Sequence, residues 1–151
     1  MFEKSLWIWQ GTGEPDEYAD FCLDFKGKSG KKYLLYICCD SDYALYNGEK
    51  LVAFGQYADY PENRVFDTVD LSKFVVSGEN HFKLTVWYQG VNSLTYVTKA
   101  VGVIFTLSED GNFILHSSSE IKSRVSPYYV PHKSSIITPQ LGLTFFYNAE
   151  A

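Results

Sequence analysis

The sequence lacks any hydrophobic run long enough to cross a bilayer as a helix. Its first residues also lack an apolar segment that ends in small residues at a cleavage site, so the sequence predicts no secretory signal. We therefore expect no membrane contact and a cytoplasmic protein. A piece trimmed from a secreted parent would show the same pattern.

Cysteine is scarce, and so are clusters of positive charge. The 3 cysteines are Cys22, Cys38 and Cys39, and an odd number with one adjacent pair does not make a disulfide framework. Neighbouring residues on a strand point to opposite faces, so Cys38 and Cys39 are expected to be small buried side chains rather than a metal or redox pair. The net charge is −5 and the longest basic run is Lys31-Lys32, so nucleic acid is not an expected partner.

Aromatic residues, in contrast, are abundant. They make up 17% of the chain, with 12 Tyr and 11 Phe, and these side chains favour pleated, half-buried surfaces. Apolar and polar residues alternate from 19 to 26 and again from 81 to 88, which is the period of a strand with one face in the core. In the second stretch the alternation predicts that Trp87 stands on the solvent face.

Two dipeptides predict tight turns between strands. Asn47-Gly48 lies between two short aromatic and aliphatic runs, and Asp110-Gly111 lies between two others. Both supply the positive φ angles of a type I′ hairpin. The run from Tyr33 to Cys39 differs, because it is apolar on both sides and must be covered on both. Either it is a central, overlaid strand or another domain packs against it.

Short strands, frequent turn signals and the absence of an amphipathic helix together indicate an all-β protein. We predict an antiparallel two-sheet β-sandwich, a jelly roll of the galactose-binding-domain-like type. The absence of repeats and low-complexity linkers predicts a single domain over residues 1–151.

Several short motifs occur in a fixed order along the chain. They are Trp7-Ile-Trp9, the aromatic entry at Tyr18 and Phe21, the hairpin 40–48, the segment 66–71 and the turn 77–80. In this order they resemble the N-terminal β-sandwich of bacterial α-L-rhamnosidases and related glycoside hydrolases. The resemblance covers nearly the whole chain, and the closing run 146–151 is similar to that family's exit into the next domain.

The resemblance implies that the chain is the N-terminal part of a longer glycoside hydrolase. The catalytic (α/α) barrel of that family, with its acidic catalytic residues, would then lie beyond Ala151. The implied partner of this domain is that catalytic domain. Its implied role is non-catalytic packing on the barrel, with carbohydrate as a further partner.

The residues themselves give no sign of catalysis in this stretch. Glycoside hydrolysis needs two carboxyl groups on opposite sides of a sugar. The acidic residues lie mainly in or next to turns, where turn formation and capping explain them: Asp40, Asp42, Asp59, Asp67, Asp70, Glu109 and Asp110. No spacing among the histidines and cysteines matches a zinc site. We predict no cofactor, and leave open a structural calcium ion held by Asp40, Asp42 or Asp67.

Carbohydrate contact is predicted from aromatic side chains with polar neighbours, because sugar sites are shallow aromatic platforms with a few fixed polar groups. The alternative is that these rings belong to the core or to an interface with a neighbouring domain. The candidate residues are Tyr57, Asp59, Tyr60, Arg64, Trp87 and Tyr96.

Two other functions remain open beside the accessory domain. One is a free-standing carbohydrate-binding module, in effect a lectin, which would show a concave face with exposed rings. The other is a protein-interaction β-sandwich, which would show a flat apolar surface. An apolar patch of more than a few hundred Å² on the isolated chain would indicate a missing partner.

Overall fold

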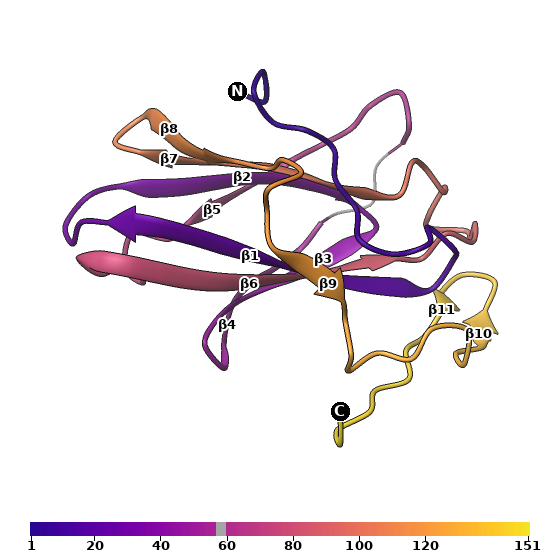
Figure 1. The fold of residues 1–151 in the computed structure, drawn as a ribbon. Coiled ribbons are helices and arrows are strands. Elements are labelled where there is room, and N and C mark those ends of the chain that lie inside the picture. Colours follow the sequence, from indigo (N-terminus) through magenta and orange to yellow (C-terminus); the bar gives the residue numbers. More distant parts are fainter. Residues whose placement is uncertain (57–59) are drawn as a thin grey trace.

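The fold consists of two antiparallel sheets packed face to face (Figure 1). The computed structural model describes residues 1–56 and 60–151. The first sheet has the order β4-β3-β6-β1-β9 and the second β5-β2-β7-β8; β10 and β11 form a small separate ribbon. The predicted all-β, antiparallel, two-sheet sandwich is confirmed. The strands are β1 (Glu17–Gly27), β2 (Tyr33–Asp40), β3 (Asp42–Asn47), β4 (Lys50–Gly55), β5 (Asp67–Asp70), β6 (Gly78–Tyr88), β7 (Gly102–Glu109), β8 (Asn112–His116), β9 (Ser123–Val125), β10 (Ile136–Thr138) and β11 (Gly142–Leu143).

Strands β1 and β6 form the centre of the five-stranded sheet. They pair without interruption from Glu17–Tyr88 to Gly27–Gly78. Alternate residues of both strands point into the core, as the alternation predicts. The inward, buried side chains are Ala19, Phe21, Leu23, Phe25, Phe82, Leu84 and Val86.

Strand β2 lies between β5 and β7 in the four-stranded sheet. Its residues Tyr33, Leu35, Ile37 and Cys39 enter the core, where they meet the inward side chains of the other sheet. Cys38 points to the outside of the sandwich and is nevertheless only 5% exposed. On this outer side Leu34 and Tyr36 are half-buried, so the strand is fully covered on its core side and partly covered on its outer side. The predicted burial of both neighbouring cysteines is confirmed, while Cys22 is exposed.

One of the two predicted hairpin turns lies where the sequence places it, and the other is displaced. Asp110 and Gly111 form the β7–β8 turn with φ of 48° and 86°, as the type I′ prediction requires. The β3–β4 turn lies one residue further along than predicted. Asn47 pairs with Lys50 inside the ladder, so the loop consists of Gly48 and Glu49, and only Gly48 has a positive φ, of 58°.

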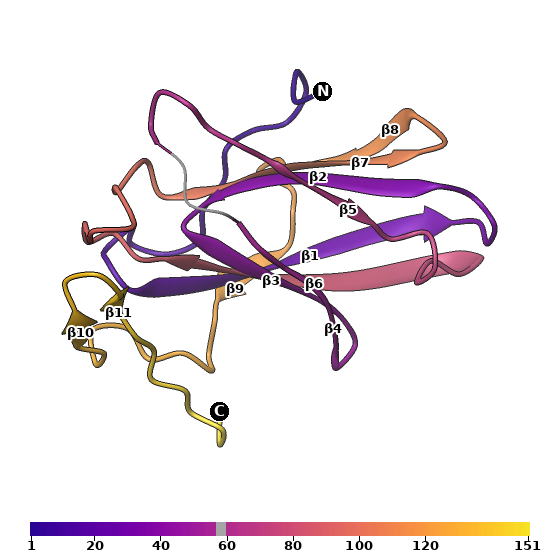
Figure 2. The same ribbon diagram turned by 180° about the vertical axis from the view of Figure 1, so that it is seen from behind.

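The two ends of the chain lie on opposite sides of the sandwich (Figures 1 and 2). The N-terminal segment passes along the four-stranded sheet, where Ile8 bridges Val103. The C-terminal segment passes along the five-stranded sheet, where Ser126 N donates to Tyr18 O at 2.8 Å. Each sheet is thus extended at one edge by a segment distant from it in sequence.

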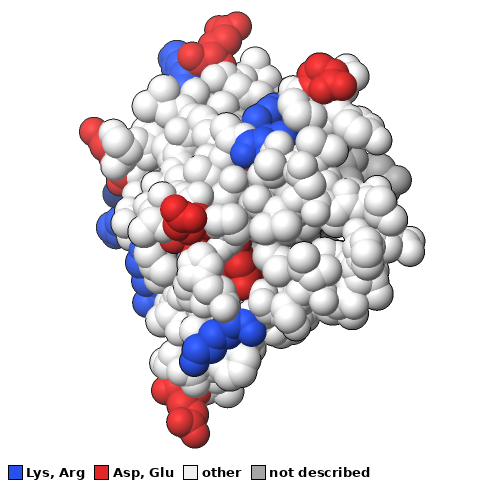
Figure 3. Space-filling model, turned by 90° about the vertical axis from the view of Figure 1, so that its right-hand side faces the viewer, with Lys and Arg blue, Asp and Glu red and all other residues white. Residues whose placement is uncertain are grey.

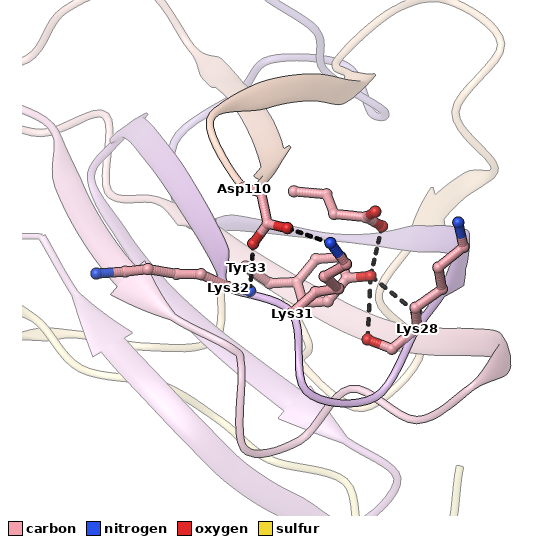
Figure 4. Close-up of polar contacts among 6 residues, drawn as sticks. Lys28, Lys31, Lys32, Tyr33 and Asp110 are labelled. Atoms are coloured by element: carbon pink, nitrogen blue, oxygen red, sulfur yellow. Dashed lines mark hydrogen bonds and ion pairs between the residues drawn. The ribbon is translucent and has the colours of Figure 1, made fainter.

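Tyr33 joins three parts of the fold through one hydroxyl group. The residue is fully buried, yet its hydroxyl accepts from Lys28 N at 2.8 Å and donates to Glu109 Oε2 at 2.5 Å. Beside it, Lys31 Nζ lies 2.6 Å from Asp110 Oδ2, so that the β1–β2 loop is tied to the β7–β8 turn (Figure 4). Burial, and then the bond to Glu109, raise the pKa of Tyr33.

We predict that Tyr33→Phe lowers the free energy of unfolding by about 1–2 kcal/mol, because Lys28 N loses its acceptor and Glu109 its donor. Chemical denaturation followed by fluorescence measures the loss. Tyr36→Phe is the matched control, since no hydrogen bond within the described residues engages the Tyr36 hydroxyl, and it should be nearly neutral. Equal losses in the two variants would contradict the assignment.

Candidate functional site

A large hollow lies on the outer side of the four-stranded sheet. It has a volume of about 650 Å³, and the side chains around it are almost all apolar. Its lining comes from the N-terminal segment, from β2 and β7, and from the segments before β5 and β7. We call it the outer apolar face; its residues are Met1, Phe2, Trp7, Cys38, Arg64, Val65, Phe66, Ala100 and Ile104.

A row of aromatic rings extends this face along the sheet. Phe66 makes edge contacts with Phe2 and Tyr36, with ring centroids 5.8 and 6.2 Å apart. Tyr36 in turn contacts Phe113 of β8 at 6.3 Å. Val65, Phe66 and Phe113 are 42–46% exposed. Large apolar side chains that are fixed in place and still exposed mark a surface suited to association.

Arg64 is the one basic side chain among the nine residues of the outer apolar face. Its guanidinium lies over the Trp7 ring, 4.6 Å from the ring centroid, and Trp7 Nε1 donates to Val101 O at 2.7 Å. These contacts hold the indole at the rim of the hollow. Burial raises the pKa of the Cys38 thiol, so this cysteine is poorly suited to act as a nucleophile. The chemistry of the face is therefore that of packing.

A second hollow lies on the outer side of the five-stranded sheet. Its volume is about 490 Å³, and its lining combines rings with charged and hydroxyl groups. We call it the tyrosine groove; its residues are Tyr46, Gly48, Glu49, Lys83, Thr85, Tyr128, Tyr129 and Tyr147. None of these residues is among those predicted from the sequence to contact carbohydrate.

The end of the sandwich that carries β10 and β11 is sparsely charged (Figure 3). The sequence from 134 to 149 contains no charged residue. Leu94 N donates to Pro139 O at 2.9 Å, so the 89–101 connection lies against the ribbon. Large apolar side chains are exposed in both segments: Leu94, Ile136, Ile137 and Leu141.

The predicted carbohydrate residues do not form one surface. Tyr57 and Asp59 lie outside the described residues. Tyr60 is 62% exposed and bridges Asn63, and Arg64 belongs to the outer apolar face. Trp87 lies on the opposite side of the sandwich, on the outer face of β6.

Trp87 is on the predicted side of its strand, but it is packed and not open to solvent. Its ring is half-buried and stacks on Tyr18 at 5.7 Å, and its Nε1 donates to Asp16 Oδ1 at 3.2 Å. Tyr96 is also half-buried; its hydroxyl donates to Thr98 Oγ1 at 3.4 Å, and burial raises its pKa to about 12. Neither ring offers an open stacking face.

The acidic side chains serve the fold. Asp110 accepts from Lys32 N at 3.0 Å, and Asp70 accepts from Ser72 N at 2.9 Å, both at turns. Asp67 accepts from the Tyr43 hydroxyl at 2.9 Å. Within residues 1–56 and 60–151, no group of three or more His, Cys, Asp or Glu is placed to hold a metal ion. Calcium binding stays an untested prediction. The same residues contain no helix that is long and apolar enough to span a membrane.

Comparison with solved structures places the sandwich among known folds. It is similar to a GH78 family rhamnosidase of Bacillus sp. GL1, with a TM-score of 0.88 and 22% identity over 99% of this chain and 16% of that chain. The chain has the fold of a β-sandwich domain of rhamnosidases. The resemblance stated from the motifs is thereby confirmed at the level of the fold.

Two further rhamnosidases share this fold. The Streptomyces avermitilis α-L-rhamnosidase complexed with L-rhamnose matches with a TM-score of 0.61 and 21% identity, over 83% of this chain and 12% of that one. The Dictyoglumus thermophilum α-L-rhamnosidase matches with a TM-score of 0.66 and 18% identity, over 84% and 17%. No protein-family model matches the sequence, and no curated protein matches it. This chain thus spans 12–17% of the length of the three enzymes.

We predict that Trp87→Ala lowers the free energy of unfolding by about 2 kcal/mol, less than the cost at a fully buried site, because the ring is half-buried and stacked. Tyr60→Ala is the control at a freely exposed ring and should leave stability unchanged. Urea denaturation of the two variants measures both effects. A neutral Trp87→Ala would instead indicate a solvent-facing ring.

Proposed function

We propose that this chain is a non-catalytic accessory domain of an α-L-rhamnosidase-like glycoside hydrolase. The observation that supports it most is the match of nearly the whole chain, 99%, to 16% of a GH78 rhamnosidase. A unit of that size accompanies a much larger body in each of the three similar enzymes. The proposed role is to pack on the catalytic domain of the same polypeptide.

The outer apolar face is the proposed packing surface. Phe66 is 46% exposed on this face, and Arg64, its one basic side chain, is held on Trp7. A surface of this composition gains free energy when a second apolar surface covers it. Arg64, which the sequence suggested for sugar contact, belongs to this face and is assigned to the same interface.

A free-standing carbohydrate-binding module is the second candidate function. The tyrosine groove favours it, since this hollow combines aromatic rings with polar groups. Sugar contact through Trp87 or Tyr96 stays a prediction, and their half-buried rings give it little support.

The size of the native polypeptide tests the accessory role. Antibodies raised against the 151-residue chain should detect, in extracts of the source organism, a protein about five to seven times longer, if the parent has the length of the three similar enzymes. The precipitated protein should hydrolyse an aryl α-L-rhamnoside. A native polypeptide of 151 residues without hydrolase activity would contradict the proposal and favour the free-standing module.

In that longer polypeptide, Val65→Asp should weaken the docking of this domain by at least about 2 kcal/mol, because a carboxylate would be buried without a partner. The expected result is faster proteolysis at the domain junction and a lower melting temperature. Val76→Asp is the matched control, because Val76 is 58% exposed and lies outside the outer apolar face. Equal behaviour of the two variants would exclude this face as the interface.

A further inference from the structure

The floor of the tyrosine groove is rigidly supported. Tyr129 stacks on Tyr18 with ring centroids 4.1 Å apart and an interplanar angle of 9°. Tyr18 stacks in turn on Trp87 at 5.7 Å, which continues the stack onto β6. Tyr129 also bridges Tyr147 through the backbone, and Asn148 N donates to Tyr128 O at 2.7 Å. The rings are therefore fixed before any ligand arrives.

Three more rings and one cation form the sides of the groove. The rings of Tyr128 and Tyr147 are nearly parallel, at 18°, with centroids 6.0 Å apart. Lys83 Nζ lies between two rings, 4.9 Å from the Tyr46 centroid and 5.5 Å from that of Tyr128. Strands β3 and β6 supply Tyr46 and Lys83, which pair directly in the ladder.

Hydrogen-bonding groups surround these rings. Within the described residues, no hydrogen bond engages the hydroxyls of Tyr46, Tyr128 or Tyr147. Glu49 is exposed in the β3–β4 turn at the edge of the groove and supplies a carboxylate acceptor. Lys83 supplies donors, and each tyrosine hydroxyl can both donate and accept.

This combination matches one class of ligand. A pyranose ring presents an apolar C–H face and a rim of neutral hydroxyl groups, which need stacking surfaces and mixed donors and acceptors respectively. The groove carries one Lys and one Glu, so its charges cancel and an anionic ligand such as a phosphate gains little. Its volume of about 490 Å³ lies within the range of about 300–1,000 Å³ for small-molecule sites.

We propose that the tyrosine groove is a carbohydrate-binding site in which a pyranose ring stacks on the exposed ring of Tyr147 and is held by Lys83 and Glu49. The choice of a rhamnoside as the first sugar rests on the proposed function. The assignment of the groove as a binding site rests on the residues of the groove alone. The site lies across the sandwich from the outer apolar face, so a domain docked on that face leaves the groove open.

The test is a titration of the isotope-labelled 151-residue chain with methyl α-L-rhamnopyranoside, and then with methyl glucoside and galactoside, followed by amide NMR shifts. We expect saturable shifts at Tyr46, Lys83 and Tyr147. Tyr147→Ala and Lys83→Met should each raise the Kd about tenfold. Both side chains are at least partly exposed, so the variants keep the fold, which their dispersed spectra verify.

Tyr60→Ala is the control at an exposed tyrosine outside the groove, and it should bind like the unaltered chain. The proposal is overturned if no sugar gives saturable shifts at millimolar concentrations, or if the shifts persist in Tyr147→Ala. Sugar binding by a native polypeptide of 151 residues would support the groove while refuting the accessory role. A longer native polypeptide with hydrolase activity whose 151-residue domain binds no sugar would support the accessory role and refute the groove as a binding site.

Discussion

The register between β1 and β6 is the constraint on which the other features depend. Because these strands pair from Glu17–Tyr88 to Gly27–Gly78, every second side chain is committed to the core. Phe21, Leu23 and their neighbours on β6 then meet the inward residues of β2 and β7. A shift by one residue would exchange the buried and outer sets, and would remove Lys83 and Thr85 of β6 from the tyrosine groove. The sandwich core therefore determines which side chains are left to face a partner.

The two outer sides of the sandwich differ in chemistry. Beside the four-stranded sheet lie exposed apolar residues with a single cation, Arg64, engaged on Trp7. Beside the five-stranded sheet lie tyrosines with a lysine and a glutamate. One side suits a protein surface and the other a ligand with many hydroxyl groups. An accessory domain of a glycoside hydrolase would use both, with the enzyme on one side and carbohydrate on the other.

Local pattern predicted most of the core, since alternation along 19–26 and 81–88 needs only neighbouring residues. It failed by one residue at Asn47-Gly48, because Asn47 pairs with Lys50 and leaves Gly48 and Glu49 in the turn. The face of β6 on which Trp87 lies was also predictable, whereas the residues that pack on its ring were not. Those residues are Tyr18 and Asp16. Residues 126–148 supply three tyrosines of the groove, and their position depends on long-range pairs such as Tyr129 with Tyr147. No periodicity marks that segment, so the groove had no signal in the sequence.

The central claim is that the outer apolar face is covered in the native protein. Hydroxyl-radical footprinting measures it directly, by comparing side-chain oxidation at Phe66 and Phe113 in the isolated chain and in the native polypeptide. Phe54, 78% exposed on the other sheet, serves as the internal reference. The account predicts strong protection of Phe66 in the native polypeptide with Phe54 unchanged. Equal oxidation of Phe66 in both samples would contradict it.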